Sequence, residues 1–322
     1  MRTAALFLLL ALPGGRAQEE PYVLKMKYAE GDSEVLGITL RMKMEIDVRS
    51  ETTDYHQITE GPLNLTMRMR CRGSRDGKSE FRCLFRDLRL DQNLSVTGLQ
   101  FRLTVRDRTV RMTDAGGKVI VDSEQGINPE KAREILEAFG PLGQEFDLTM
   151  DDRGLVPDLR KKTELRKLFP GGAGDNLLPV VLPEKAVRVG EEWVYTGTMH
   201  EIGDIQIPGE ALKIPITYRL ERVEGREDDR VAVITMKQNV ELKNVEGSGR
   251  IEGTGEARIL ISSLTSTGEG TTRFHLGRGR ILDSRFEAKV ATAMRIQPED
   301  MAEMSTTVHL GMKGRMTPRR EF

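Results

Sequence analysis

Leu36–Ile46 reads LGITLRMKMEI, and its side chains alternate between apolar and polar. Because successive side chains of a β-strand point to opposite faces, this alternation predicts a strand with one apolar and one polar face. The same period of two recurs in Leu63–Arg72, Glu80–Leu90, Leu99–Arg106 and Arg285–Ile296. One-sided strands of this kind are typical of antiparallel sheets that pack on one side. The sequence therefore predicts a mainly β protein built from large antiparallel sheets.

Two short helices are predicted in the middle of the chain. Asn128 supplies an N-cap, Pro129 a first helical residue, and Gly140-Pro141 ends this helix. The second helix covers Leu159–Phe169. A single helical turn near Pro298–Met304 is expected before the last strand.

Glycines mark the expected turns, at Gly116-Gly117, Gly247–Gly249 and Gly277–Gly279. The segment Met150–Leu155 (MDDRGL) carries two aspartates that invite comparison with a calcium loop. Its spacing lacks the alternate ligands and the twelfth-position glutamate of an EF-hand, so a hairpin turn is the better interpretation.

The first seventeen residues have the layout of a secretory signal peptide. Met1-Arg2 is basic, Ala4–Leu12 is an unbroken apolar run, and cleavage is expected between Ala17 and Gln18. No later stretch has the length of apolar sequence that a transmembrane helix needs. We therefore expect an exported protein, periplasmic or extracellular, without a transmembrane segment after signal removal.

The mature chain divides into residues 18–176, a β-rich half that ends in the two helices, and residues 177–322, an antiparallel half. Leu63–Gln92 and Ile214–Asn244 share a strand–turn–strand plan. This likeness leaves two interpretations open, namely two similar β-rich halves or one continuous domain with a curved sheet.

Cys71 and Cys83 are the only cysteines, and they lie on two strands joined by a glycine-rich turn. In an oxidising compartment, a disulfide across this hairpin is one interpretation, and it would stabilise the fold by roughly 3 kcal/mol. Two unpaired buried thiols are the other.

Charge and motifs exclude several classes of function. The chain has 49 basic and 50 acidic residues, so nothing predicts a nucleic-acid partner. The four histidines show no metal-binding spacing, and the Met-x-Met pairs are better explained by core packing than by copper. We therefore expect no metal and no cofactor, and we name no catalytic residue.

Trp193, the single tryptophan, follows a turn at the start of a strand. It is a weak candidate for a ligand contact, and a plug at the rim of the sheet is the more ordinary role for it.

Three blocks, Gln144–Asp158, Leu182–Trp193 and Gly279–Met294, occur in an order similar to that of an uncharacterised family of exported, strand-rich bacterial proteins. The resemblance implies an exported antiparallel β protein with a curved sheet around a hydrophobic groove. It brings no catalytic residues.

The leading functional hypothesis is a non-enzymatic exported protein that binds a lipid-like or peptide ligand. The alternatives are an exported hydrolase whose site is assembled from dispersed Asp, Glu and His residues, and a structural or assembly component of the cell envelope.

Overall fold

The computed structural model of the protein describes residues 20–51, 54–94, 99–140, 142–157, 178–199, 201–202, 205–206, 212–251, 255–298 and 303–320. The predicted signal peptide, including Ala17 and Gln18, lies outside the described residues. So do the predicted helix Leu159–Phe169 and residues 299–302, where the predicted helical turn falls.

Strands make up most of the described chain, which confirms the predicted mainly β class. The strands of the first half are β1 (Ser33–Arg49), β2 (Asp54–Arg75), β3 (Lys78–Leu94), β4 (Leu99–Arg106), β5 (Thr109–Asp114), β6 (Val119–Asp122) and β7 (Glu145–Asp151). Those of the second half are β8 (Glu192–Met199), β9 (Glu201–Ile202), β10 (Ile205–Gln206), β11 (Leu212–Glu224), β12 (Val231–Ile251), β13 (Gly255–His275), β14 (Arg280–Pro298) and β15 (Met304–Arg320).

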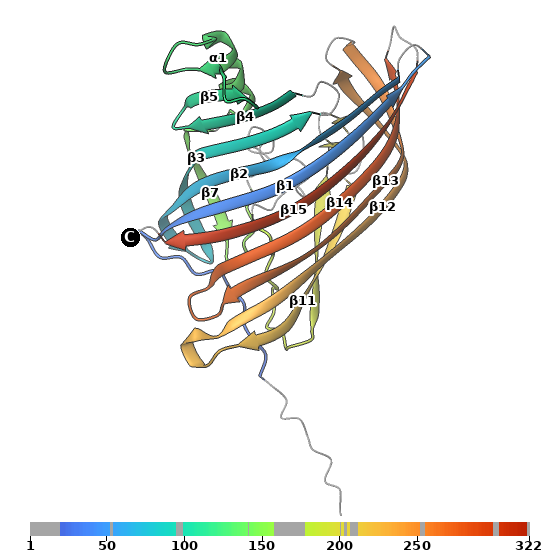
Figure 1. Ribbon diagram of the computed structural model, residues 1–322. Helices are drawn as coiled ribbons and strands as arrows, with labels where there is room; N and C mark the ends of the chain where they lie inside the picture. The colour runs from blue at the N-terminus through green and yellow to red at the C-terminus, as the bar shows by residue number, and fades with distance from the viewer. Residues whose placement is uncertain are drawn as a thin grey trace, which may run out of the picture.

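All fifteen strands belong to one antiparallel sheet (Figure 1), whose central order is β6-β5-β4-β3-β2-β1-β15-β14-β13-β12. Strand β11 pairs with both β12 and β8, and β7 pairs with the first part of β3. Strands β1 and β15 lie side by side, with Leu40 opposite Gly314. The sheet therefore takes in strands of both predicted halves, which are joined through β1 and β15.

The first predicted helix is confirmed as α1 (Pro129–Ala138). Asn128 has a positive φ of 51°, and its side chain accepts a hydrogen bond from the Lys131 amide. A short 3-10 turn, Glu227–Asp229, connects β11 to β12. No helix in the described part of the chain combines the length and the apolar character that crossing a membrane requires.

One turn prediction was wrong. Gly247–Gly249 lies inside β12, where Gly247 pairs with Ile259 of β13. A glycine in a strand brings no side chain to pack, but it leaves the ladder hydrogen bonds intact, so it need not end the strand. The other two glycine turns are confirmed, with positive φ at Gly117 and Gly279.

The core lies on the face of the sheet that carries the apolar residues, which we call the inner face. On β1 it takes in Leu36, Ile38 and Leu40, each no more than 8% exposed. The same core cluster takes in buried residues from segments outside the strands, namely Leu24, Met26, Leu142, Val156, Leu178, Val180, Val181 and Leu182.

A buried ion cluster ties the segment before β1 to the sheet. Arg280, at the start of β14, has a side chain only 7% exposed, with Nη2 2.5 Å from Asp32 Oδ2 and Nε 2.9 Å from Glu34 Oε1. Its guanidinium also lies 3.5 Å from the centre of the Tyr28 ring, a cation–π contact. Burial raises the pKa of Glu34, and Arg280 opposes this shift. The cluster therefore places the carboxylates of Asp32 and Glu34 around one cation, the guanidinium of Arg280.

We expect Arg280→Met to destabilise the protein by about 3–5 kcal/mol, because it leaves the buried Glu34 without its cation. Urea unfolding measures the change. The control is Arg285→Met, which removes an exposed cation 3.4 Å from Asp283 and should cost less than about 1 kcal/mol. Equal losses in the two variants would contradict a central role for the Arg280 cluster.

Candidate functional site

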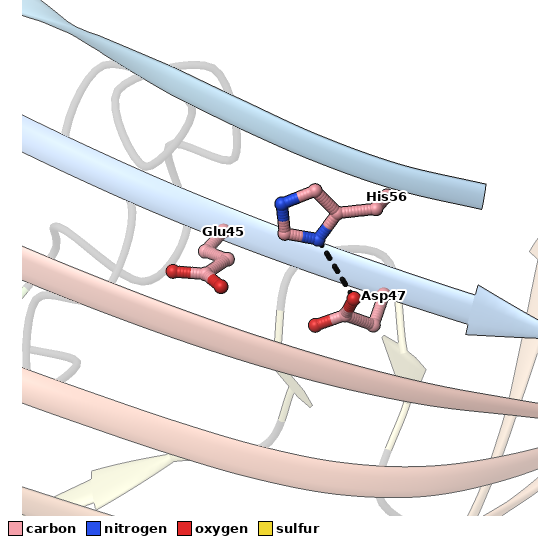
Figure 2. Close-up of side chains that lie close together, drawn as sticks. All are labelled: Glu45, Asp47 and His56. Atoms are coloured by element: carbon pink, nitrogen blue, oxygen red, sulfur yellow. Dashed lines mark hydrogen bonds and ion pairs between the residues drawn. The ribbon is translucent and has the colours of Figure 1, made fainter. Parts of the chain in front are cut away.

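The face of the sheet opposite the core, the outer face, brings together two acids and a histidine from neighbouring strands (Figure 2). Glu45 and Asp47 are two residues apart on β1, so they share a face, and Asp47 is paired directly with His56 of β2. His56 Nδ1 lies 2.7 Å from Asp47 Oδ1. The ligand atoms of Glu45, Asp47 and His56 all lie within 4.8 Å of one another. We call these three residues the outer cluster.

The outer cluster is partly open to solvent. The side chain of Asp47 is 32% exposed and that of His56 is 49% exposed. No ion pair or hydrogen bond of the Glu45 side chain is found among the described residues. Carboxylate oxygens and an imidazole nitrogen are the donors that divalent transition metals accept. The arrangement can therefore hold a cation or an exchangeable proton.

The inner face changes character along β1. After Leu40, the inward residues Met42, Met44, Ile46 and Val48 are all half-buried rather than buried. Among their inward neighbours on β14 and β15, Val290, Val308, Leu310 and Met312 are also half-buried, whereas Thr292 and Thr306 are buried. Most of these half-buried residues lie outside the core cluster, and we call six of them the inner patch: Met44, Ile46, Val290, Val308, Leu310 and Met312.

The register makes the inner patch continuous. Met44 is opposite Leu310, and Leu310 is opposite Val290, so one row crosses β1, β15 and β14. Ile46 is opposite Val308 in the next row. Directly opposed side chains on one face are in contact distance, so the patch is a single apolar surface.

A cavity of about 340 Å³, lined mainly by polar residues, lies where the ladder between β2 and β3 is interrupted. Gly61 and Pro62 pair with β1 but have no partners on β3. The cavity is lined by Gln92, among other polar residues, and the buried Gln92 Oε1 has no hydrogen-bond partner among the described residues. An unpartnered buried acceptor favours a bound water or a ligand hydroxyl.

Gly61 lets the two strands approach each other here. A Cβ at this position would overlap the carbonyl oxygen of Asp91, which is backbone and cannot swing away. We expect Gly61→Ala to destabilise the fold by about 3 kcal/mol in urea unfolding. Gly37→Ala is the control, because its Cβ would lie 3.7 Å from the nearest atom, the Thr317 carbonyl oxygen, and its effect should stay within about 1 kcal/mol. A harmless Gly61→Ala would show that the close approach is not needed.

The predicted disulfide is absent from the structure, where Cys71 and Cys83 are both buried and no S–S bond joins them. The predicted hairpin is present, but its register pairs Cys71 with Phe81 and Cys83 with Met69. The two cysteines are therefore one diagonal step apart and not opposite each other. Cys71 Sγ lies 3.4 Å from the Gly73 carbonyl oxygen, and burial raises the pKa of its thiol.

We expect both thiols to resist an alkylating reagent in the native protein and to react once it is unfolded. Burial keeps the reagent out, and for Cys71 the raised pKa reduces the reactive thiolate fraction further. Mass spectrometry of the alkylated, non-reduced protein counts the modified cysteines. If the unfolded protein is alkylated only after a reducing agent has been added, the two cysteines form a disulfide and the expectation of reduced thiols is wrong.

Trp193 has a packing role in the structure. Its indole nitrogen donates a hydrogen bond of 2.7 Å to the Val181 carbonyl oxygen, and its ring stacks on Tyr218 with 5.7 Å between centroids. The hydrogen bond ties the connector before β8 to the sheet, and the stacking joins β8 to β11, where Tyr218 is directly opposite Trp193. A ligand contact by Trp193 stays a prediction.

The remaining candidate residues fall in separate places. Asp151 accepts hydrogen bonds from the Arg153 and Leu155 amides, and Gly154 has φ of 91°, as the hairpin interpretation predicts. His275 is buried, with Nε2 3.7 Å from Asp229. His200 lies outside the described residues.

The outer cluster was missed from sequence. Glu45 and Asp47 are part of the polar–apolar alternation of β1, and in the sequence nothing distinguishes them from other acidic residues on the solvent-facing side of a strand. His56 joins them only through the β1–β2 register, and no local spacing motif records that register.

No protein-family model matches this chain, and no curated protein matches it. Among solved structures, it is similar to the β domain of the Bordetella autotransporter BrkA, at 9% identity over 89% of this chain and 99% of that one, with a TM-score of 0.25. It is also similar to the translocator domain of the autotransporter NalP from Neisseria meningitidis, at 7% identity over 91% and 90%, with a TM-score of 0.20. A third is Ail of Yersinia pestis, at 7% identity over 90% and 99%, with a TM-score of 0.16.

TM-scores this low carry no argument about fold or function. The strand-rich character implied by the resemblance to exported bacterial proteins is confirmed by the sheet itself. Membership of that family, and export, stay predictions.

Proposed function

We propose that this chain is an exported, non-enzymatic protein that binds a lipid-like ligand on the inner face of its curved sheet. The observation that carries the proposal is the inner patch, a continuous apolar surface that remains half-exposed beyond the core. Removing such a surface from water is favourable by about 25 cal/mol for each Å² covered.

The composition of the patch favours an acyl chain over an aromatic ligand. Its residues are aliphatic or methionine, and the thioether side chains of Met44 and Met312 are flexible enough to fit a chain without a fixed shape. The inward residues from Met42 to Val48 span roughly 20 Å along β1 at the usual rise per strand residue. An extended long-chain acyl group is of this order of length.

Neighbouring residues of β14 offer a matched test, because Val290 faces inward and Lys289 faces outward. We expect the wild type to bind a long-chain fatty acid that carries a fluorescent label. Val290→Glu should weaken binding by about tenfold or more, since it places a charge against the acyl chain. Lys289→Glu makes the same acid on the opposite face and should leave the affinity unchanged.

Native mass spectrometry of gently extracted protein provides an independent measurement. A bound mass in the lipid range supports the proposal, and a homogeneous ligand-free mass together with no fatty-acid binding overturns it. Equal affinity of the two variants would also overturn it. A stoichiometric protein partner in envelope extracts, with no lipid bound, would favour the assembly role instead.

A further inference from the structure

The outer cluster has a fourth potential ligand on a third strand. His309 of β15 is directly opposite Glu45, just as His56 of β2 is directly opposite Asp47. Opposed residues in a ladder point to the same face, and neither strand pair shifts register along β1. Two imidazoles and two carboxylates therefore share one patch of the outer face, brought together from both ends of the chain.

We propose that Glu45, Asp47, His56 and His309 bind a zinc ion on the outer face of the sheet. The ion would link β2, β1 and β15 across their ladders. This inference does not depend on the proposed lipid binding, because it concerns the opposite face.

The distances suit a tetrahedral ion. Zinc bonds of about 2.0–2.2 Å place the ligand atoms of a tetrahedron about 3.4 Å apart. The three atoms of the outer cluster already lie within 4.8 Å of one another, and Asp47 Oδ1 and His56 Nδ1 are 2.7 Å apart. His309 does not belong to the group within 4.8 Å, so its ring has to turn toward Glu45 to complete the set. Figure 2 shows the other three side chains on the same side of β1.

The negative charges of Glu45 and Asp47 also favour a bound cation. Glu45 and Asp47 are like charges on one face, and like charges this close are unfavourable. The outer-face cations of β1 that flank the two acids are Lys43, which is exposed, and Arg49, whose Nε lies 3.9 Å from Asp54. Glu45 has no ion-pair partner among the described residues. A divalent ion between the two carboxylates removes this repulsion.

The kinds of ligand atom indicate which metal the site would bind. Imidazole nitrogen with carboxylate oxygen suits zinc and its first-row neighbours. Magnesium and calcium prefer oxygen ligands throughout, and copper(I) prefers sulfur. A plain aspartate–histidine ion pair is the competing explanation of the 2.7 Å contact, and it predicts no metal binding at all.

Isothermal titration of the full chain, freed of metal with a chelator, tests the site with zinc alone. We expect one ion per chain and a rise in the midpoint of thermal unfolding, because an ion that binds only the folded protein stabilises it. Magnesium at the same concentration should not raise the midpoint. Glu45→Gln, His56→Ala and His309→Ala should each weaken zinc binding at least about tenfold, the lower end of what loss of even an outer-shell partner costs.

The matched control is Glu287→Gln. It removes another half-buried acid of the outer face, on β14, which is 3.0 Å from Lys313 Nζ and faces no histidine. Its zinc affinity should equal that of the wild type. Unfolding of the metal-free variants shows whether each still folds, and all four replaced side chains are exposed or half-buried, so we expect them to fold.

The absence of zinc binding, or wild-type affinity in Glu45→Gln or His56→Ala, would overturn the site. Wild-type affinity in His309→Ala would overturn the four-ligand assignment. Loss of affinity in Glu287→Gln equal to that in Glu45→Gln would show that zinc binds to surface acids in general.

Discussion

The unbroken register of β1 is the constraint on which the rest of the structure depends. From Ser33 to Arg49 it pairs with β2, and from Glu34 to Arg49 with β15, with no bulge in either ladder. Because side chains alternate with a period of two, a slip of one residue would exchange the faces. The inner patch and the outer cluster are therefore two sides of one strand segment, with Met44 and Ile46 inward and Glu45 and Asp47 outward.

Irregularities on either side of this regular centre are where the sheet bends. Register shifts occur between β2 and β3, at Thr66/Met67 and Cys71/Gly73, and between β13 and β14, at Ile261/Ser263 and Arg273/Phe274. A bulge adds a residue to one strand, bends it and increases its twist. The curvature in Figure 1 can thus develop in the flanking strands while the central ladder keeps its faces separate. The buried Arg280 cluster then fixes the segment before β1 to the start of β14.

What the sequence predicts correctly is local. The alternation of Leu36–Ile46, the hairpin that carries the two cysteines and the Asn128 cap each depend on residues that are close along the chain. What it misses depends on register. The disulfide prediction failed because the β2–β3 register sets Cys71 and Cys83 on a diagonal and not opposite each other. Gly247–Gly249 was assigned to a turn because glycine alone does not distinguish a turn from a strand interior. Placing His309 beside Glu45 requires the closing contact between the first and last strands, which no local pattern encodes.

The inward side chains of β1 become more exposed to solvent along the strand, and this change bears on the function of the sheet. Leu36, Ile38 and Leu40 belong to the buried core cluster, whereas the inward residues from Met42 to Val48 are half-buried. A sheet that needed only to enclose this core could end near Leu40. The strands continue instead, with an apolar inner face and an outer face that gathers acids and histidines. Apolar surface kept exposed on a long, regular ladder costs stability unless something covers it, which is the physical reason to look for a ligand at this end of the sheet.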